Sequence, residues 1–348
     1  MAGLEQTIRY GGFLLYCCGV VVKTTHFCYA EIRVWHDKRQ RMGVEDCMKL
    51  LVIGGSYFFG RVFVMESTEH EITVVNRGTY SMAEYGALQV TGDRHDRALW
   101  RGITQDFDVV IDFCAYEKGD IAFVLEHMGG KIGQYILIST VDVYERGKSG
   151  LMAEDTAFEK RLFQGEAGSY IAGKVALEEE IRQVCGMRNI PWTVLRPAIL
   201  YGPYNYAPRE SYFVQLMVQN KVLPIITDAT GQFQFLYVKD AALAVKACLL
   251  NPKTFGQAYN LCGDEILDYE RFAKELERQA EPDVQFVRMT ANQARRQGIL
   301  LPFPVDSGES HLCSNEKSRM QLKFSYTEFA CGMEKMYHAF AGVYGSYG

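Results

Sequence analysis

The sequence predicts an α/β fold built on a doubly wound parallel sheet, with a smaller α/β lobe attached. Short, continuous apolar runs recur from Met48 onward, and helix-length segments separate them. Strands that are apolar on both faces are typical of parallel sheets covered by helices on each side. Right-handed crossovers between such strands then give the doubly wound arrangement.

These runs place the individual elements. After residue 205 the pattern becomes less regular, because Gly, Pro and Gln interrupt shorter elements. A helix near Asp240 and a strand at 258–261 are nevertheless expected to return to the first domain. The other expected strands are 50–53, 72–76, 108–113, 135–139 and 192–195, and the expected helices are 60–65, 120–128 and 170–184.

The expected domains follow from this pattern. The first domain covers 48–205 together with parts of 236–262, and a smaller substrate lobe over 206–348 interleaves with it. Because Met48 opens directly into a strand, residues 1–47 are expected to form a poorly ordered N-terminal extension. The apolar stretch in that extension, 10–22, is too short to span a bilayer. An export signal cleaved near Ala30 is the alternative interpretation of this segment.

Composition limits the classes of function. The 348 residues are 48% hydrophobic and carry a formal net charge of -5, which argues against a general nucleic-acid binder because phosphate neutralisation needs clustered Lys and Arg. The ten cysteines include no C-x-x-C pair, so neither a zinc site nor a disulfide framework is indicated. We therefore expect a cytoplasmic protein with reduced thiols, no bound metal and no association with membranes.

A glycine-rich turn joins the first expected strand to the first expected helix. Such a turn places backbone N–H groups and the positive end of a helix beneath a pyrophosphate, as in Rossmann-type dinucleotide-binding domains. Tyr57 stands where the central glycine of that pattern belongs, and a tight turn without a ligand needs glycines for the same steric reason. The expected cofactor contacts here are Gly54, Gly55, Ser56, Tyr57, Phe58 and Gly60.

The second expected strand ends where a residue that reads the cofactor ribose belongs, roughly 20 residues beyond the turn. An Asp or Glu at this position would favour NAD, whereas this chain has Asn76 and Arg77. The cation suits the 2′-phosphate of NADP. The cofactor is therefore expected to be NAD(P), with a preference for NADP; an exposed surface charge is the alternative interpretation of Arg77.

A tyrosine and a lysine four residues apart, Tyr170 and Lys174, lie on one face of an expected helix. A lysine cation close to a phenol favours phenolate and is expected to lower the pKa of Tyr170 toward working pH, which suits general acid–base chemistry. Thr140 follows the preceding strand, where a parallel sheet presents its ligands. Its hydroxyl is placed to hold a substrate oxygen beside Tyr170.

Over about 48–344, the order of these motifs resembles that of the extended short-chain dehydrogenase/reductase family. The epimerases and dehydratases of this family use NAD(P). The resemblance implies that Asp93 lies near the adenine, Ala115 near the cofactor ribose and Lys174 on the nicotinamide ribose, with Thr140 and Tyr170 at the reacting carbon. It also implies cofactor contacts at Arg94, Cys114, Tyr116 and Pro197, and a substrate contact at Tyr201. The motifs are the glycine turn, Asn76-Arg77-Gly78, Gly92-Asp93-Arg94, Asp112-Phe113-Cys114-Ala115, Arg196-Pro197, Tyr201-Gly202-Pro203 and Tyr237-Val238-Lys239-Asp240.

The chain departs from the family pattern at two groups that grip the diphosphate of a sugar nucleotide. Ile199 and Leu200 replace the Asn expected before the Tyr-Gly-Pro motif, and Gln232 or Phe233 occupies the place of an expected Arg. Arg209 is a candidate replacement anion ligand, and a rim charge paired with the following acid is the alternative. With a bulky residue between its glycines, the turn also resembles that of an atypical branch of the family, which includes chloroplast stem-loop RNA-binding proteins.

The expected function is an NAD(P)-dependent epimerase, dehydratase or reductase acting on a sugar or nucleotide-sugar-like substrate. The alternative is a non-catalytic dinucleotide-binding regulator or RNA-associated protein of the same fold. A homodimer is expected from the family, through the helices at 120–128 and 170–184. Aromatic residues after the Tyr-Gly-Pro motif are expected to pack at the lobe interface or to contact a sugar ring: Tyr204, Tyr206, Tyr212 and Phe213.

Overall fold

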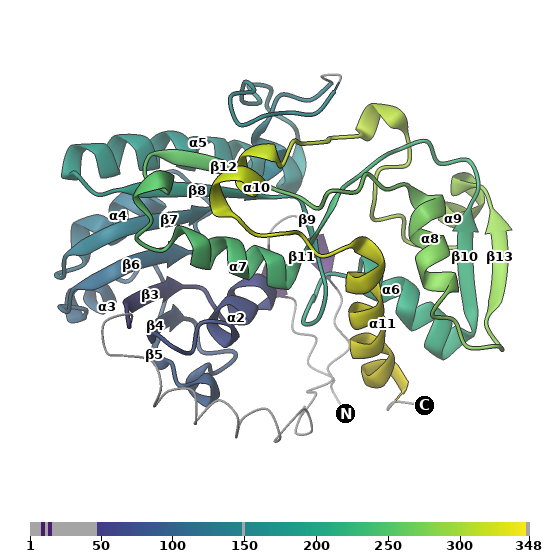
Figure 1. Ribbon diagram of the computed structural model, residues 1–348, viewed down its shortest axis with the longest axis horizontal. Coiled ribbons are helices and arrows are strands. Elements are labelled where there is room, and N and C mark those ends of the chain that lie inside the picture. Colours follow the sequence, from purple (N-terminus) through teal and green to yellow (C-terminus); the bar gives the residue numbers. More distant parts are fainter. Residues whose placement is uncertain (1–7, 11–12, 16–46, 148–149, 346–348) are drawn as a thin grey trace.

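The computed structural model describes residues 8–10, 13–15, 47–147 and 150–345 of the chain (Figure 1). Its main layer is a seven-stranded sheet in the order β12-β8-β7-β6-β3-β4-β5, in which every neighbouring pair is parallel. The chain winds outward from β3 in both directions, so the doubly wound α/β prediction is confirmed. The strands are β3 Lys49–Ile53, β4 Glu71–Asn76, β5 Leu88–Thr91, β6 Phe107–Asp112, β7 Ile132–Ile138, β8 Trp192–Pro197 and β12 Gln257–Leu261.

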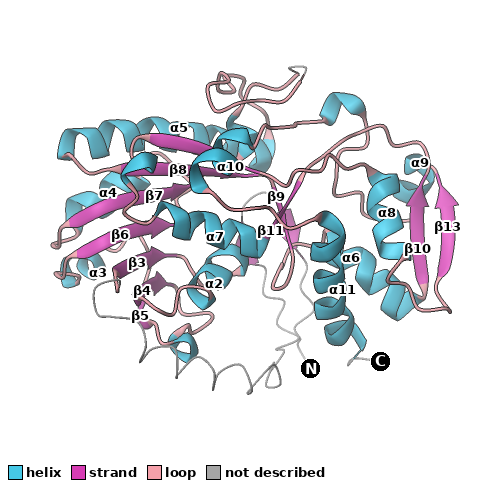
Figure 2. Ribbon diagram, in the orientation of Figure 1, coloured by secondary structure: helices cyan, strands magenta, loops and turns pink. Residues whose placement is uncertain are grey.

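Helices cover both faces of this sheet (Figure 2). In β3, Leu50 and Val52 pack into the apolar cluster on one face, and Leu51 and Ile53 pack into the cluster on the other. Burial on both faces explains why this strand is a continuous apolar run. On the first face lie α2 Phe58–Met65 and α7 Val238–Cys248, and on the second lie α3 Arg97–Gly102, α4 Asp120–His127 and α5 Gly165–Arg188.

Among the strands of the seven-stranded sheet and the helices that cover it, two elements were not expected from the sequence. β5 is one of the two edge strands of the sheet and is not fully buried at any of its positions, so it lacks a continuous apolar run. α3 is a single short helix whose N-terminus is capped by Asp96, the side chain of which accepts a hydrogen bond from the backbone N–H of Ala98. Both elements are too short or too polar for periodicity to identify.

A smaller lobe packs beside the carboxyl end of the sheet. The pairing of β9 with β11 lies between the sheet and this lobe (Figure 1), and β10 pairs with β13 inside it. The expected return of the chain is confirmed, since α7 begins at Val238 and β12 joins the sheet beside β8. The division of the chain at residue 205 stays a prediction. The elements are β9 Ile199–Tyr201, β10 Val222–Ile226, β11 Phe235–Tyr237, β13 Gln285–Met289, α6 Glu210–Gln215, α8 Tyr269–Glu277, α9 Ala291–Arg296, α10 Glu316–Leu322 and α11 Phe329–Gly345.

Most of the expected N-terminal extension, 1–47, lies outside the described residues. Within it, β1 Ile8–Tyr10 pairs antiparallel with β2 Phe13–Leu15. In the described part of the chain, no helix combines the length and the apolar character needed to cross a membrane. The remaining short helical turns are η2 Ala83–Tyr85, η3 Val141–Val143, η4 Leu216–Asn220, η5 Pro252–Thr254 and η6 Ser307–Glu309.

Candidate active site

The turn between β3 and α2 has the shape that a phosphate needs. Gly54 and Gly55 have φ values of 103° and 63°, in the left-handed region that favours glycine. A Cβ on Gly60 would lie 2.7 Å from the Cα of Gly55, so this glycine lets α2 start directly against the turn. No side chain caps the first N–H groups of α2 in the part of the chain that the structure describes. These groups and the helix end fit a pyrophosphate.

Tyr57 takes the place of the central glycine without strain, because its backbone is extended with φ -120°. Its ring lies edge-on to the rings of Tyr80 and Tyr206, at centroid distances of 5.1 Å and 5.9 Å. Tyr80 follows β4 and Tyr206 belongs to the loop before α6. The substituted position therefore connects the turn to two other segments.

The two residues expected to contact the cofactor ribose, Asn76 and Arg77, differ in burial. Asn76 is buried, and its Oδ1 accepts hydrogen bonds from the Gly78 backbone N–H at 2.7 Å and from Gln89 Nε2 at 3.3 Å. Arg77 is exposed at the same loop. Asn76 thus shapes the loop, and contact between Arg77 and a 2′-phosphate stays a prediction.

Arg94 and Asp112 form a buried pair at the carboxyl end of β6. Arg94 Nη1 lies 3.1 Å from Asp112 Oδ1 and Nη2 lies 3.0 Å from Oδ2, while the Tyr135 hydroxyl donates to Oδ2 at 2.6 Å. Asp93 is exposed, and its Oδ1 accepts the backbone N–H of His95. In this geometry Arg94 fixes the end of β6, and its direct contact with a cofactor stays a prediction, as does that of Asp93.

Lys174 ties α5 to the ends of two strands. Its Nζ donates to the backbone carbonyl oxygens of Ala115 and Ile138, each at 2.8 Å, and the side chain is buried. A Cβ on Gly173 would lie 2.1 Å from the carbonyl oxygen of Tyr116, so only glycine allows this close approach of α5. The segment from Cys114 to Tyr116 is thereby fixed beside Lys174.

Tyr170 lies in the same place, with its ring centroid 5.7 Å from Lys174 Nζ. Burial raises the pKa of Tyr170 and the Asp142 carboxylate adds to the rise, whereas a hydrogen bond with Thr140 and the charge of Arg209 act in the opposite direction. Burial also lowers the pKa of Lys174 to about 8. The net shift of the Tyr170 pKa is upward, mainly because of burial, and is opposite to the lowering expected from a neighbouring lysine. The ammonium of Lys174 donates to backbone carbonyls and not to the phenol.

A buried ion pair, which the sequence did not lead us to predict, fixes the residue next to Thr140. Arg196 donates from Nε to Glu178 Oε1 at 2.8 Å and from Nη2 to Oε2 at 2.6 Å, and both side chains are 0% exposed. The Ser139 hydroxyl donates to Glu178 Oε1 at 2.7 Å, which fixes the residue before Thr140. An arginine inside an apolar strand needs a buried partner, so Arg196 itself was the available signal.

The two expected substrate contacts have unequal surroundings. Tyr201 is 1% exposed and stacks on Phe235 at 5.0 Å within the core of the smaller lobe, so its ring has no free surface to offer a substrate. Arg209 is partly exposed, and its backbone N–H donates to the carbonyl oxygen of Ala207 at 2.8 Å, whereas its guanidinium forms no hydrogen bond or ion pair within the described ranges. The acid that follows it, Glu210, points inward and accepts from Asn205 Nδ2 at 2.8 Å. The two side chains form no salt bridge, although the charge of Arg209 acts to lower the pKa of Glu210, so both interpretations of Arg209 stay predictions.

The remaining expected residues divide between the two lobes. Pro197 ends β8, buried at the same edge of the sheet as Thr140. Phe213 packs in the core of the smaller lobe and Tyr212 packs against that core, whereas Tyr204 and Tyr206 stay exposed and reach toward α2. The expectation of packing at the lobe interface therefore holds for the pair nearest the glycine turn.

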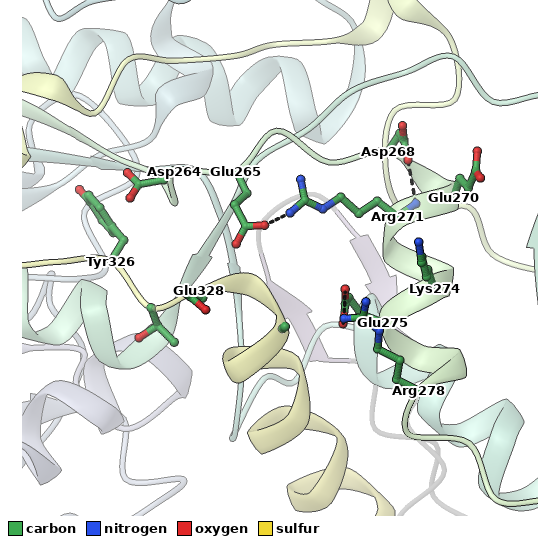
Figure 3. Close-up of a pocket in the computed structure, with 12 residues that line it drawn as sticks. Asp264, Glu265, Asp268, Glu270, Arg271, Lys274, Glu275, Arg278, Tyr326 and Glu328 are labelled. Carbon is green, nitrogen blue, oxygen red and sulfur yellow. Dashed lines mark hydrogen bonds and ion pairs between the residues drawn. The ribbon is translucent and has the colours of Figure 1, made fainter.

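A charged groove of about 720 Å³ lies elsewhere, along α8 and the start of α11 (Figure 3). Its arginines contact neighbouring acids: Arg271 bonds to Glu265, and Arg278 lies 2.8 Å from Glu275. None of the residues expected to bind cofactor or substrate lines this groove. The size of the hollow therefore does not mark the candidate site.

Comparisons with known proteins agree with this arrangement. The sequence model described as "NAD dependent epimerase/dehydratase family" matches residues 50–262. The chloroplast stem-loop binding protein of 41 kDa b from Arabidopsis thaliana is 27% identical over 246 residues, which span 65% of this chain but only 61% of that relative. The low-salt glycan biosynthesis protein Agl12 of Haloferax volcanii is 25% identical over 285 residues, covering 72% of this chain and 90% of the relative.

The fold is also that of solved structures. The UDP-glucuronic acid 4-epimerase from Bacillus cereus, solved in complex with UDP-glucuronic acid and NAD, superposes with a TM-score of 0.65 at 20% identity. The match covers 85% of this chain and 100% of that one. At this identity the likeness establishes the shared fold.

Proposed function

The chain belongs to the NAD-dependent epimerase/dehydratase family, and from this premise we propose that it epimerises, dehydrates or reduces a sugar or nucleotide-sugar-like substrate with NAD(P) as cofactor. One observation carries the proposal. Thr140, Tyr170 and Lys174 converge at the carboxyl ends of neighbouring parallel strands, beside a turn shaped for a pyrophosphate. Ligands of doubly wound sheets bind at this edge.

The residues fit a dinucleotide. Gly54, Gly55 and Gly60 leave the backbone of the turn open, and the N–H groups at the start of α2 would hold the pyrophosphate. Ala115 and Lys174 would hold the nicotinamide ribose. A bound nicotinamide supplies a hydride acceptor and donor.

Tyr170 would move the proton that accompanies this hydride. Its raised pKa keeps the phenol protonated near neutral pH, so the phenol can donate its proton to the oxygen of a substrate carbonyl that is being reduced. In the reverse direction the phenolate takes the proton from the substrate hydroxyl. Thr140 would hold the same substrate oxygen by a hydrogen bond, and Lys174 would fix the strand ends around it.

Arg209 supports an anionic substrate. The charge of its guanidinium acts against the rise in the Tyr170 pKa and also acts to lower the pKa of Glu210, but within the described residues the guanidinium forms no salt bridge. A phosphate or carboxylate of the substrate would supply the missing partner. Arg209→Gln should raise KM more than it lowers kcat, and Arg209→Lys should restore part of the loss.

The NADP preference has a separate test at Arg77. If this cation contacts the 2′-phosphate, Arg77→Ala should weaken NADP binding about tenfold and leave NAD binding unchanged. Equal losses for both cofactors would contradict the preference.

An activity screen tests the proposed function. Wild-type protein and Tyr170→Phe are each incubated with NAD+ or NADP+ and a panel of UDP- and dTDP-sugars, and product formation is followed. We expect turnover of at least one substrate by the wild type, falling by about 10²-fold to 10⁴-fold in Tyr170→Phe with cofactor binding retained. Retained cofactor through turnover would identify an epimerase or dehydratase, and exchange with free cofactor a reductase.

The second candidate is a dinucleotide-binding regulator or RNA-associated protein. It is favoured by the similarity to the Arabidopsis chloroplast stem-loop binding protein and opposed by the net charge of -5. Cofactor binding without any turnover that depends on Tyr170 would support it against the enzyme. A cytoplasmic homodimer formed through α4 and α5 is a further part of the proposal, and light scattering of the purified chain measures that state.

A further inference from the structure

Three tyrosine rings form a row across the glycine turn, and we call Tyr80, Tyr57 and Tyr206 the aromatic bridge. Tyr57 stands in the middle, edge-on to both neighbours at centroid distances of 5.1 Å and 5.9 Å. Tyr80 belongs to the loop expected to read the cofactor ribose, and Tyr206 belongs to the loop between β9 and α6. The bridge therefore joins the ribose side of the turn to the smaller lobe.

A second contact runs beside the bridge. The guanidinium carbon of Arg61, in the first turn of α2, lies 4.9 Å from the ring centroid of Tyr204. On the other side, Arg61 Nη2 donates to the Tyr85 hydroxyl at 3.2 Å and to Glu84 Oε1 at 3.3 Å. Arg61 thus connects the same two regions that the bridge connects, next to the pyrophosphate-shaped turn.

Hydrogen bonds to the buried Glu210 carboxylate hold the loop that carries Tyr204 and Tyr206. Glu210 is 0% exposed, and its Oε1 accepts the backbone N–H of Gly202 at 3.2 Å and Asn205 Nδ2 at 2.8 Å. Tyr204 has φ 68°, a conformation that costs a non-glycine residue about 1 kcal/mol or more and persists only where surrounding contacts impose it. The two rings are therefore presented by a fixed loop.

We propose that the aromatic bridge closes the cofactor site over the glycine turn, and that Tyr206 is the residue that the smaller lobe contributes to this site. A dinucleotide on the turn would have its pyrophosphate beside Tyr57, and the ring contact between Tyr57 and Tyr206 must separate before the dinucleotide leaves. This role explains a tyrosine at the glycine position, because glycine would leave Tyr206 without a partner. The bridge favours a cofactor retained through turnover, and the inference rests on the proposed function.

Cofactor release measures this directly. Full-length protein loaded with NADH or NADPH is mixed rapidly with excess oxidised cofactor, and the decay of bound-cofactor fluorescence gives the release rate. Tyr206→Ala and Tyr57→Gly should each release cofactor roughly threefold to tenfold faster, from the lost ring contact. Tyr206→Phe keeps the ring and should stay within about twofold of the wild type. Phe286→Ala, which removes an exposed ring elsewhere in the smaller lobe, should leave the rate unchanged.

The outcomes separate the bridge from the proposed function. Tight binding with release rates that do not change in Tyr206→Ala or Tyr57→Gly overturns the bridge and leaves the enzyme proposal intact. Failure of the wild type to bind either cofactor overturns both. Equal acceleration in Tyr206→Phe and Tyr206→Ala also overturns the bridge, because the phenyl ring alone would then have no effect.

Discussion

The edge of the seven-stranded sheet and the charged groove of the smaller lobe both contain glutamate–arginine pairs, but the pairs differ in burial. Glu178 and Arg196 are 0% exposed, and both carboxylate oxygens of Glu178 accept hydrogen bonds. In the groove, the guanidinium side chain of Arg278 is 56% exposed where it meets Glu275. Removal of one partner from a buried pair leaves an uncompensated charge, whereas water replaces a lost partner at the surface.

This difference shows why the groove, despite its volume of about 720 Å³, is the weaker candidate for chemistry. Its arginines Arg271 and Arg278 are 47% and 56% exposed and are paired with the acids Glu265 and Glu275 (Figure 3). At the sheet edge, buried groups hold Thr140, Tyr170 and Lys174 in one arrangement. Preorganised polar groups with limited access to water are what an active site requires. Variants in the two regions should therefore differ in stability and in activity.

Removal of one acid from each pair should give the largest difference. Glu178→Ala should lower the free energy of unfolding by about 3–5 kcal/mol, because Arg196 stays buried without a counter-charge. Glu275→Ala, the matched change in the groove, should cost at most about 1 kcal/mol. Urea unfolding of both variants measures the two values. Similar losses would show that burial does not distinguish the regions.

Lys174 should make stability depend on pH. Burial lowers its pKa to about 8, so between about pH 8 and pH 10 the unfolded chain binds more protons at this residue than the folded chain does. Its contribution to stability therefore rises with pH across that window. Relative to Lys174→Met, the wild type should gain about 2 kcal/mol of unfolding free energy from pH 8 to pH 10. A difference that stays flat or falls would be inconsistent with a buried amine.

Two glycine substitutions should affect different properties, one the cofactor affinity and the other the stability of the chain. A Cβ on Gly60 meets the backbone of Gly55, so Gly60→Ala must shift the turn and should weaken NAD(P) binding about tenfold or more. Gly186 lies in α5 with no atom within 4 Å of a Cβ, and Gly186→Ala should stabilise the chain by about 0.5–1 kcal/mol without changing cofactor affinity. Calorimetric titration and thermal unfolding of both variants provide the check. An unaltered affinity in Gly60→Ala would refute the assigned role of the turn.

The smallest effect is expected in the groove. Lys274 is exposed on α8, and Lys274→Ala should change the free energy of unfolding by less than about 0.5 kcal/mol and leave cofactor affinity and turnover at wild-type levels. A loss of turnover in this variant would indicate that the groove, and not the sheet edge alone, takes part in the reaction.

The sequence predicted most of the sheet because burial on both faces leaves a local signature. The run at Leu50–Leu51–Val52–Ile53 shows that signature, and the edge strand β5 does not. The glycine turn was predictable for a similar reason, since its backbone needs glycine at particular positions. Its contact with Tyr206 was not, because those residues are far apart in the chain.

The candidate site was predictable as a set of side chains but not as a set of interactions. Spacing placed Tyr170 and Lys174 on one helix face, yet the lysine donates to the carbonyl groups of Ala115 and Ile138, which no spacing rule identifies. Glu178 looked like one acid in a run of three, and only the fold shows that it turns inward to Arg196. Tertiary contacts decide both cases.

The central claim is that the turn from Gly54 to Gly60 holds a nicotinamide dinucleotide, and isothermal titration calorimetry tests it most directly. The full chain is titrated with NAD+ and with NADP+. We predict saturable binding of at least one of them, with one site per chain. Absence of binding heat for both cofactors up to about 1 mM would contradict the claim.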